Sequence, residues 1–343
     1  MTIKVAIIGV GNSASSFVQG LKYYRERGDG LWHSKVSGYG VEDIEVVAAF
    51  DVDRRKVGKD LADAIFSEPN RVKKYVEIER GIEVKPGLLL DRLPEGIRME
   101  LVSVGPEEFS EELKRSGADM ALNLINSFMP DSSKAYAEAC LSAGCSFLNA
   151  TPAYLARDDG LVKRYEEAKL LLLGDNLMSQ LGGTIFHKGI IDFIQKRGLK
   201  LVESYQLDVS GGLEGLAVID ERTREVKRRL KADAINLELH QGARVEAGTV
   251  DYVEYMGNNR TSYFWLSAEG FLGERFTLDA YLRTNDGANA GNVLLDLVRA
   301  AYGLMNKGIY GAPDVLCNYG FKNTRKPVKQ EEALRAFEAE FCG

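Results

Sequence analysis

The chain has 343 residues, 45% of them hydrophobic and 27% charged, which is typical of a globular protein with two domains of ordinary size. The formal net charge of −6 argues against a nucleic-acid partner, because such a partner usually requires a basic face. No apolar run approaches the ~20 residues of a membrane span, so we expect none. The first strand is predicted from residue 3, so we expect no signal peptide ahead of it and a cytoplasmic location.

The cysteines and histidines do not favour a metal site. The four cysteines, Cys140, Cys145, Cys317 and Cys342, lack the spacing of metal ligands, and three histidines are few for a histidine-built site. Cys140 and Cys145 fall on a predicted helix and the strand after it, so we expect them to be buried reduced thiols.

The first predicted strand, residues 3–8, leads into a glycine turn. It ends in Gly9-Val10-Gly11-Asn12-Ser13-Ala14, and apolar residues at helical spacing follow. A strand, a glycine turn and a helix in this order form the dinucleotide-binding unit, in which Gly9 permits the turn and Gly11 lets the backbone approach a pyrophosphate. Ala14 lets helix and strand pack closely, and the helix N-terminus favours phosphate. The predicted cofactor-binding residues here are Gly9, Gly11, Asn12, Ser13 and Ala14.

A carboxylate follows the second predicted strand, residues 44–50. Asp51 at its tip suits the ribose hydroxyls of an adenosine and would repel a 2′-phosphate, which favours NAD over NADP. Gly11 and Asp51 are 40 residues apart, twice the usual separation of ~20. The excess falls in residues 25–40, which we interpret as an inserted loop.

Strands and helices alternate through the first half of the chain. Helices are predicted over 57–66, 106–115, 131–143 and 157–169, strands over 99–104, 118–125, 145–150 and 170–173, and an irregular segment over 68–94. This alternation predicts an α/β fold, a doubly wound parallel-sheet Rossmann domain. Ligands of such sheets bind at the carboxyl ends of the strands, although each polar residue there, taken singly, is more typical of a turn cap. The cofactor-binding candidates at these ends are Asn126, Ser127, Thr151 and Asp175.

The pattern changes after Asp175. A helix is predicted over 179–195, and segments 201–210, 251–255, 262–270 and 275–283 alternate polar and apolar residues, as antiparallel strands with one wet face do. An apolar helix over 289–305 would return to the first domain. We therefore predict a discontinuous NAD-binding domain, 1–175 and 290–343, and a second α+β domain, 176–289, for catalysis and oligomerisation.

Three polar segments of the second half could carry chemistry. The loop-to-helix junction 174–184 offers amides and the side chains of Ser179, Gln180 and Thr184 to a phosphate. Lys227 and Lys231 lie four residues apart, on one helix face, and could hold a sugar phosphate, although such a run is more typical of a solvated face. The turn 285–291 could also simply cap a helix.

These residues together resemble the myo-inositol-1-phosphate synthase family in its short prokaryotic form. The likeness covers nearly the whole chain, and the matching segments are 7–20, 48–66, 144–152, 174–187, 205–212, 227–235 and 289–299. Members use NAD to oxidise C5 of glucose 6-phosphate, form the C6 enolate, close the ring on C1 by an aldol step and return the hydride. The resemblance implies an isomerase with no net redox change, a homotetramer, and a place in cyclitol and phospholipid biosynthesis.

The family also implies site residues. Its catalytic lysines are matched by Lys227, Lys231 and, in a more divergent tail, Lys322. Asp175 falls in a matching segment, and Arg260 stands in place of a family lysine; both are implied catalytic residues. The implied substrate-binding residues are Ser179, Gln180, Thr184, Lys227 and Lys231. The implied cofactor-binding residues beyond the first half are Asp175, Asn176, Asp286 and Ala290. Some members also use a metal ion, monovalent or divalent.

The sequence departs from the family at the substrate end. The family's Gly-Asp-Asp-x-Lys-Ser-Gln reads here with Asn176 for the second carboxylate and Met178 for the lysine. The family's Asp-Arg-Lys ends here in Arg260, which keeps the charge but is a poor proton shuttle. Losing two charged groups at an aldol site should cost several kcal/mol, unless another group or another substrate geometry compensates.

Four interpretations remain open from the sequence. The first is a glucose-6-phosphate cyclase with a rearranged site, and the second a related carbocyclase acting on another sugar phosphate such as fructose 6-phosphate. The third is an NAD-dependent sugar-phosphate oxidoreductase, and the fourth a non-catalytic NAD-binding paralogue. Met178 argues against the unmodified first interpretation, whereas Lys227 and Lys231 argue against the fourth.

Overall fold

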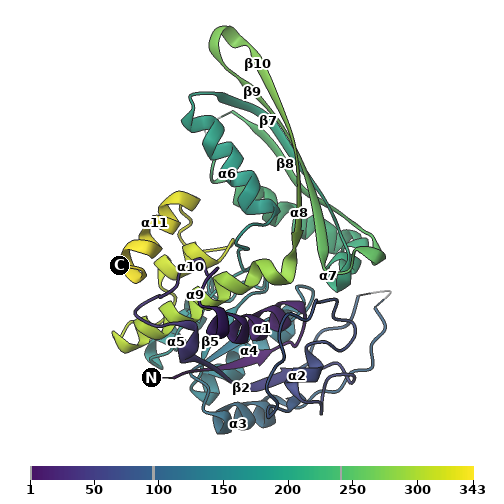
Figure 1. Ribbon diagram of the computed structural model, residues 1–343, viewed down its shortest axis with the longest axis vertical. Coiled ribbons are helices and arrows are strands. Elements are labelled where there is room, and N and C mark those ends of the chain that lie inside the picture. Colours follow the sequence, from purple (N-terminus) through teal and green to yellow (C-terminus); the bar gives the residue numbers. More distant parts are fainter. Residues whose placement is uncertain (1, 95–96, 240–241) are drawn as a thin grey trace.

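The computed structural model of the protein describes residues 2–94, 97–239 and 242–343. The predicted domains also include residues 1, 95–96 and 240–241, which lie outside the described residues. The chain folds into two lobes, each built around its own sheet, with the longer strands projecting away from the first lobe (Figure 1).

The first lobe contains a parallel sheet. Its strands pair in the order β3-β2-β1-β4-β5-β6, six strands within the described residues, which confirms the doubly wound arrangement. Their bounds are β1 Ile3–Ile8, β2 Ile44–Asp51, β3 Val84–Pro86, β4 Met120–Asn123, β5 Ser146–Asn149 and β6 Leu172–Leu173. The strand order reverses between β1 and β4, and ligands of such sheets bind outside the carboxyl ends at that point.

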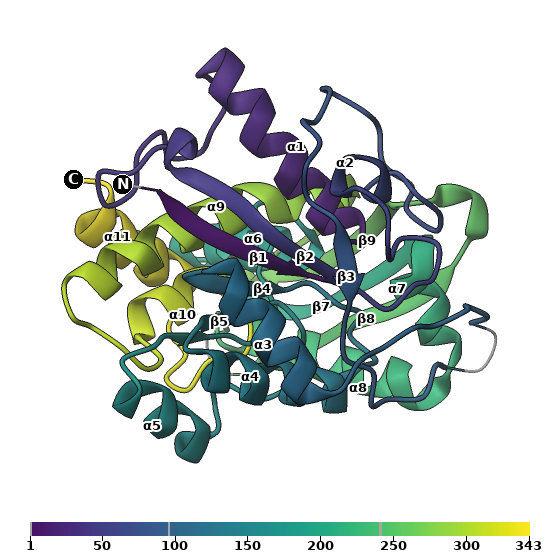
Figure 2. The ribbon, with the colours of Figure 1, turned by 90° about the horizontal axis from the view of Figure 1, so that it is seen from below.

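Helices cover both faces of this sheet (Figure 2). On one face lie α1 Asn12–Arg27, α9 Asp286–Asn306, α10 Asp314–Gly320 and α11 Gln330–Phe341. On the other lie α3 Pro106–Ser116, α4 Pro130–Ala143 and α5 Asp159–Glu167. The residues of β1 alternate between the two cores, because successive side chains of a strand point to opposite faces.

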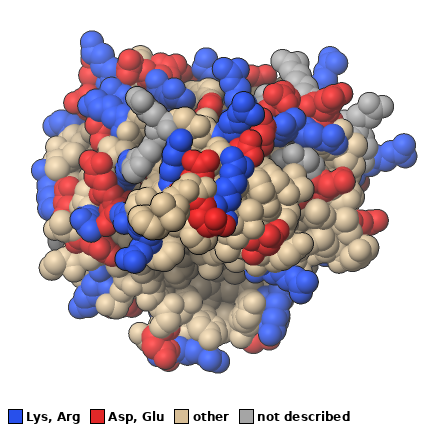
Figure 3. Space-filling view, turned by 90° about the horizontal axis from the view of Figure 1, so that it is seen from above, with Lys and Arg blue, Asp and Glu red and all other residues tan. Residues whose placement is uncertain are grey.

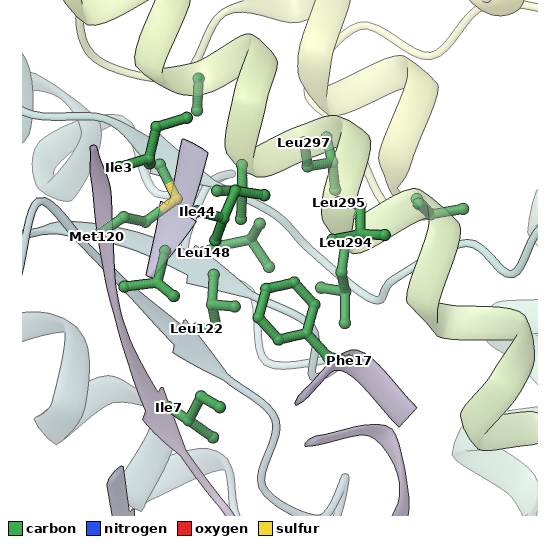
Figure 4. Packing of buried hydrophobic residues seen from close by; sticks show 14 of the residues in the cluster. Ile3, Ile7, Phe17, Ile44, Met120, Leu122, Leu148, Leu294, Leu295 and Leu297 are labelled. Carbon is green, nitrogen blue, oxygen red and sulfur yellow. The ribbon is translucent and has the colours of Figure 1, made fainter. Parts of the chain in front are cut away.

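Helix α9 supplies much of the first core. Its apolar side chains pack against Phe17 of α1 and against the face of the parallel sheet that α1 covers. Figure 4 shows this packing, with Leu294 and Leu295 of α9 near Leu122 and Leu148 of the strands. Each fully buried leucine or phenylalanine contributes about 1.5–3 kcal/mol relative to an exposed one. This burial brings a helix from late in the sequence back onto the first sheet, as predicted.

Two elements of the first lobe differ from the sequence predictions. The helix predicted over 57–66 is reduced to α2 Leu61–Ala64, because Gly58 has a positive φ of 83° and Asp60 caps the helix only from Leu61. The strand predicted over 99–104 forms only isolated bridges at Leu101 and Ser103. The third strand is β3, which lies within the segment predicted to be irregular and pairs with the end of β2.

The second lobe is a mixed sheet of order β10-β9-β7-β8, covered by two longer helices. The bounds are α6 Gly183–Lys196, β7 Lys200–Ser210, α7 Gly212–Leu216, α8 Glu221–Asn236, β8 Arg244–Tyr252, β9 Asn259–Glu269 and β10 Arg275–Asn285. The pairs β7–β9 and β9–β10 are antiparallel, as predicted. The pair β7–β8 is parallel, because the chain crosses over through α8 between these two strands.

A short two-stranded ribbon joins the C-terminal part of the chain to the region between the lobes. Asp175 and Asn323 exchange backbone hydrogen bonds of 3.0 and 3.1 Å, Lys322 N donates to Asn176 O at 2.9 Å, and Met178 N donates to Gly320 O at 2.7 Å. The ribbon carries the segment around Lys322 to the same place as the loop before α6. Nothing in the sequence pattern predicted this pairing.

Within the part of the chain that the structure describes, no helix combines the length and the apolar character that crossing a membrane would require. Cys140 and Cys145 are buried and unpaired, as predicted for these two thiols.

Candidate active site

The glycine turn after β1 has the geometry that a bound phosphate group requires. Gly9 has a positive φ of 90°, and a Cβ there would come within 2.8 Å of Ile125 N, so a side chain is excluded on both counts. Gly11 caps the N-terminus of α1, and a Cβ there would meet no atom within 4 Å. The backbone at Gly11 therefore faces open space rather than protein, and a dinucleotide phosphate could approach it closely.

The carboxylate of Asp51 braces this turn from the tip of β2. Its Oδ2 accepts a hydrogen bond of 2.7 Å from Val10 N, and its Oδ1 accepts from Val52 N and Asp53 N at 2.7 and 2.8 Å. Lys56 donates to Val10 O at 2.8 Å and lies 3.8 Å from Asp51 Oδ2. Burial lowers the pKa of Lys56. The sequence reasoning assigned Lys56 no role, although it stands in a segment that matches the family.

A cavity of ≈ 300 Å³, here called the cofactor cleft, opens between these groups and the second lobe. Most of the predicted cofactor residues line it: Gly9, Gly11, Asn12, Ser13, Asp51, Asn126, Ser127, Thr151, Asn176, Asp286 and Ala290. Ala14 does not line it, because its side chain points from α1 into the first core. The glycine turn, the α1 N-terminus and the Asp51 acceptor are together the groups that a dinucleotide needs.

Asp175 lies outside the cofactor cleft. Its buried carboxylate accepts hydrogen bonds from Asn149 Nδ2 at 2.7 Å, Leu155 N at 2.9 Å and Ala156 N at 3.1 Å. Burial raises the pKa of Asp175 to about 7, against the opposing effect of these bonds. In this position the carboxylate organises the loop after β5 rather than facing a ligand.

A second cavity, of ≈ 140 Å³ and here called the polar cavity, adjoins the cofactor cleft. Both have Ser179 and Asp286 in their walls, so the two spaces meet at these residues. The polar cavity is lined by Met178, Ser179, Gly182, Gly183, Thr184, Ile185, Gln206, Asp208, Lys231, Arg260, Asp286 and Lys322. The structure thus gathers side chains from α6, α8, α9, two strands and the C-terminal ribbon.

Two of the cations in the polar cavity are held by carboxylates. Lys231 forms an ion pair with Asp208 Oδ2, and Arg260 Nη1 lies 3.9 Å from the same oxygen. Arg260 also donates to Asp286, from Nε at 3.0 Å and from Nη2 at 2.7 Å, both to Oδ2. Burial lowers the pKa of Lys231, in opposition to the charge of Asp208.

Lys322 is different from these two cations. Among the side chains that the structure describes, none forms a hydrogen bond or ion pair with its ammonium group. Burial, and then repulsion by Lys231 and Arg260, lowers the pKa of Lys322 to about 8. An amine with this pKa exists in both protonation states near neutral pH, which suits a group that takes up and releases a proton.

Two predicted substrate residues are not in the polar cavity. Lys227 of α8 is half-buried and lies outside its walls, although its charge is near enough to lower the pKa of Lys231. Gln180 is turned towards α9, where its Oε1 accepts a hydrogen bond of 2.9 Å from Asn292. Ser179, Thr184 and Lys231 do line the cavity.

Met178 and Asn176, the two substituted positions of the family motif, lie in different cavities. Met178 is buried and forms an apolar part of the cavity wall, next to polar neighbours. Asn176 lines the cofactor cleft and donates to Asn323 Oδ1 at 2.9 Å, within the C-terminal ribbon. The polar cavity therefore has an uncharged thioether where the family's lysine would stand.

Sequence reasoning missed Asp208 and its neighbours on β7. Ser204, Gln206, Asp208 and Ser210 alternate along this strand and are all between 1% and 3% exposed. We predicted that the polar side of such a strand faces water, and for β7 this was wrong. Its polar side lies under α6 and α8, while Leu207, on the other side, is 41% exposed. The alternation was the available signal, but it does not say which face is covered.

Across the described portion of the chain, no three His, Cys, Asp or Glu side chains come together in a way that could hold a metal ion. His187 is buried in α6, where its Nδ1 and Nε2 contact Gln206 and Ser204, and burial lowers its pKa to about 4. It is therefore a neutral part of the second core.

Comparisons with known proteins identify the family of the chain. A sequence model described as Myo-inositol-1-phosphate synthase matches residues 182–287. The inositol-3-phosphate synthase of Corynebacterium glutamicum is 32% identical, over 98% of this chain and 98% of its own length. The chain belongs to the inositol-3-phosphate synthase family.

Solved structures share the fold of the chain. The crystal structure of Ari2 superposes with a TM-score of 0.80 and 28% identity, over 99% of both chains. A myo-inositol-1-phosphate synthase-related protein from Thermotoga maritima has a TM-score of 0.82 over 99% of this chain and 98% of its own, with 21% identity, and thus shares the fold. The family resemblance in the sequence is confirmed, and the protein is an inositol-phosphate synthase-like enzyme.

Proposed function

We propose that this enzyme is an NAD-dependent sugar-phosphate cyclase that oxidises a hexose 6-phosphate transiently, enolises it, closes the ring by an aldol step and reduces the product to a cyclitol phosphate. The observation that carries the proposal is the shared wall of the two cavities. Ser179 and Asp286 line both, so a sugar in the polar cavity would meet the reactive end of a dinucleotide in the cofactor cleft. Such a contact is what intramolecular redox chemistry needs.

The cofactor cleft fits NAD. Gly11 leaves open space for the pyrophosphate, and the free amides of α1 face it. Asp51 presents its carboxylate at the tip of β2, where a ribose would bind and a 2′-phosphate would be repelled. NAD, when bound there, supplies an acceptor that takes hydride from the sugar and gives it back within one turnover.

The side chains of the polar cavity would supply charge stabilisation and proton transfer. Lys231 and Arg260 carry fixed positive charge, which stabilises an oxygen that becomes negative during enolisation or holds the phosphate group. Lys322 accepts the proton from C6 and returns a proton to the C1 oxygen after the C6–C1 bond has formed. The oxidation releases one hydroxyl proton and the re-reduction takes one up, so the overall reaction is an isomerisation.

A second candidate is a carbocyclase that acts on a ketose phosphate, for example fructose 6-phosphate, by the same sequence of oxidation, aldol closure and reduction. Met178 favours it, because the wall that carries a lysine in the family is apolar here. An apolar wall binds a carbon face of the sugar better than a hydroxylate or phosphate oxygen. A substrate with a different placement of its carbonyl would suit this wall.

The experiment compares substrates by their products. The enzyme is incubated with NAD⁺ and either glucose 6-phosphate or fructose 6-phosphate, and the mixture is followed by phosphorus NMR, with Lys322→Met as the inactive control. A new cyclitol phosphate without net reduction of the cofactor supports the cyclase, and the substrate consumed selects between the two candidates. Stoichiometric reduction of NAD⁺ would instead indicate an oxidoreductase, and no turnover of either sugar would contradict both cyclase proposals.

We propose that the chain is divided into the two domains that the sequence predicted, one for the cofactor and one for catalysis. Residues 1–175 and 290–343 would form the cofactor domain, and 176–289 the catalytic and oligomerisation domain. Limited proteolysis with and without NAD⁺ tests the division. Cleavage confined to the joints near 176 and 289 supports it, whereas cleavage inside the parallel sheet contradicts it.

We also propose that the enzyme assembles as a homotetramer through the second sheet. The face of β7, β9 and β10 that points away from α6 carries an aromatic group with Tyr205, Tyr263, Trp265 and Tyr281, and Tyr281 is 72% exposed. Seen from the end where these strands project, lysines, arginines and carboxylates are interspersed around an uncharged hollow (Figure 3). Light scattering on the wild type and on Tyr281→Glu measures the mass. A monomeric wild type would contradict this proposal.

A further inference from the structure

The carboxylate of Asp208 lies at the base of the polar cavity, and neither the sequence motif nor the family resemblance gave it a role. Its side chain is fully buried, and hydrogen-bond donors surround both oxygens. Lys231 donates to Oδ2, while Ser262 Oγ donates to Oδ1 at 2.5 Å. Gln206 Nε2 bridges the two oxygens at 3.0 and 3.1 Å. No oxygen of this carboxylate is left to a ligand without displacing one of these donors.

This arrangement fixes the direction of two cations. The stem of Lys231 runs across β8 at Gly248, where a Cβ would come within 2.6 Å of Lys231 Cδ. Its ammonium group reaches Asp208 from one side, and Arg260 Nη1 lies 3.9 Å from the same carboxylate from the other. Because Gly248 packs against its stem and Asp208 binds its ammonium group, the Lys231 side chain loses most of its rotamer freedom.

A role in stability alone does not account for Asp208. Buried ion pairs are poor stabilisers, because the cost of removing both charges from water offsets most of their attraction. A negative charge in a cavity that receives a sugar phosphate also weakens binding of the substrate. A carboxylate that costs affinity and adds little stability is retained most simply if it improves the placement of the cations.

We propose that Asp208 is a positioning residue, which aims Lys231 and Arg260 at the substrate and thereby leaves Lys322 as the amine that exchanges protons. The inference rests on the proposed sugar-phosphate cyclase. Asp208 does not touch the substrate; it acts through the two cations. Its charge also keeps the polar cavity from becoming too positive for Lys322 to take up a proton.

Several charged or titratable groups face Asp208. They come from each element packed around it and are His187 of α6, Lys231 of α8, Arg260 of β9, Asp286 of α9 and Lys322 of the C-terminal ribbon, with Lys227 behind Lys231. Burial alone would raise the pKa of Asp208, but the charges of Lys231 and Arg260 outweigh it and hold that pKa well below its usual range. Asp208 is therefore ionised throughout the working pH range.

The substitution Asp208→Asn tests the proposal by steady-state kinetics. We expect kcat to fall on the order of 100-fold, because Lys231 loses its placement, while KM for the sugar phosphate stays unchanged or falls, because a negative charge has gone. The midpoint of the pH profile should move to lower pH, since Asp208 raises the pKa of Lys322. Asp208→Glu keeps the charge and should recover part of kcat. A raised KM with unchanged kcat would overturn the proposal.

A matched control removes a buried carboxylate elsewhere. Asp296 accepts from Arg299 Nη2 at 2.7 Å and from Tyr319 Oη at 2.5 Å, and it lines neither the cofactor cleft nor the polar cavity. We expect Asp296→Asn to lower the melting temperature and to leave the midpoint of the pH profile in place. Equal shifts of that midpoint in both variants would reduce Asp208 to a structural residue.

A measurement without turnover separates this inference from the proposed function. The NAD-loaded full-length enzyme is labelled with acetic anhydride over a range of pH, and mass spectrometry reports the titration of Lys231, whose side chain is 18% exposed. Asp208→Asn should move the midpoint for Lys231 to lower pH, because Asp208 raises that pKa. If no sugar phosphate is turned over, the proposed function fails, while a shifted midpoint still supports the coupling and an unchanged midpoint overturns it.

Discussion

The cofactor cleft and the polar cavity adjoin each other but are built in different ways. The cleft depends on backbone groups of short turns, such as the amides after Gly11, and on one carboxylate, Asp51, that follows a strand. The polar cavity depends on side chains, Lys231, Arg260 and Lys322, that come from separate elements. A backbone-built site tolerates changes in most side chains, whereas a side-chain-built site changes its chemistry with each substitution.

This contrast explains where the sequence departs from its family. Met178 and Arg260 replace family lysines, and both line the polar cavity. The groups that define the cofactor cleft, Gly9, Gly11 and Asp51, keep the expected identities. The cleft wall also varies at Asn176, where the family has a carboxylate, so the constant part is the glycine turn with Asp51 and not the whole cleft. Variation around a constant dinucleotide turn is how one redox scaffold can serve different sugar phosphates.

The largest effect is expected in the polar cavity. Lys231→Met removes the ammonium group that contacts the buried Asp208 carboxylate and leaves Arg260 at 3.9 Å from it; breaking a buried ion pair typically costs about 3–5 kcal/mol. If most of this loss appears in the transition state, kcat falls on the order of 100-fold or more, since ~1.4 kcal/mol is tenfold in rate. Stopped assays give kcat, and calorimetry should show NAD affinity within about twofold of the wild type. Lys163→Met on the exposed surface is the control; a weakened NAD affinity would mean that the two sites are not separable.

The two glycines of the turn should separate folding from binding. Gly9→Ala places a side chain 2.8 Å from Ile125 N at positive φ, so we expect it to lower the free energy of unfolding by about 1–2 kcal/mol or more. Gly11→Val adds its Cβ where no protein atom lies within 4 Å, so stability should be kept while NAD affinity falls, on the order of 100-fold. Thermal unfolding and calorimetry measure both. Normal NAD affinity in Gly11→Val would exclude the pyrophosphate from this turn.

Removal of the Asp51 carboxylate should have a smaller effect on the cleft. Asp51→Ala loses the ribose acceptor and also the bond to Val10 N, so we expect the Kd for NAD to rise about 10-fold, the worth of one or two hydrogen bonds. Turnover at saturating NAD should change little, because Lys231 and Lys322 are untouched. An unchanged Kd would remove Asp51 from the cofactor site.

The pH dependence should originate in the polar cavity. Lys322 must be neutral to accept a proton, and its pKa of about 8 lies below the usual value for lysine. The rate at saturating substrate should therefore rise with pH, about tenfold per unit well below pH 8, and level off above it. Met178→Lys adds a like charge to the wall and should move the midpoint to lower pH. A rate that falls as pH rises through 8 would show that Lys322 works as a cation.

The smallest effect is expected at Lys227. It lies on α8 outside the polar cavity and acts on Lys231 only through its charge. We expect Lys227→Ala to lower kcat by only a few-fold and to raise the midpoint of the Lys231 titration. Labelling and kinetics on the same preparation measure both quantities. A complete loss of turnover would place Lys227 against the substrate and enlarge the proposed cavity.

The features that the sequence predicted well are formed by residues that are close together in the sequence. The strand, the glycine turn and the start of α1 are consecutive, so their geometry follows from local backbone preferences, and Asp51 is placed by the end of the next strand. The parallel sheet also follows from the alternation of strand and helix patterns along the chain. The family motifs then drew attention to Lys231, Arg260 and Lys322 without indicating what holds them.

Only the tertiary structure decided how the polar cavity is assembled. Asp208 lies on the covered face of β7, and alternation along a strand does not reveal which side another helix covers. Lys322 reaches the cavity through a ribbon with the segment before α6, and no local pattern records a pairing between residues so far apart in the chain. The cofactor cleft follows from local backbone geometry, whereas the cavity that selects the substrate depends on which distant side chains are packed together.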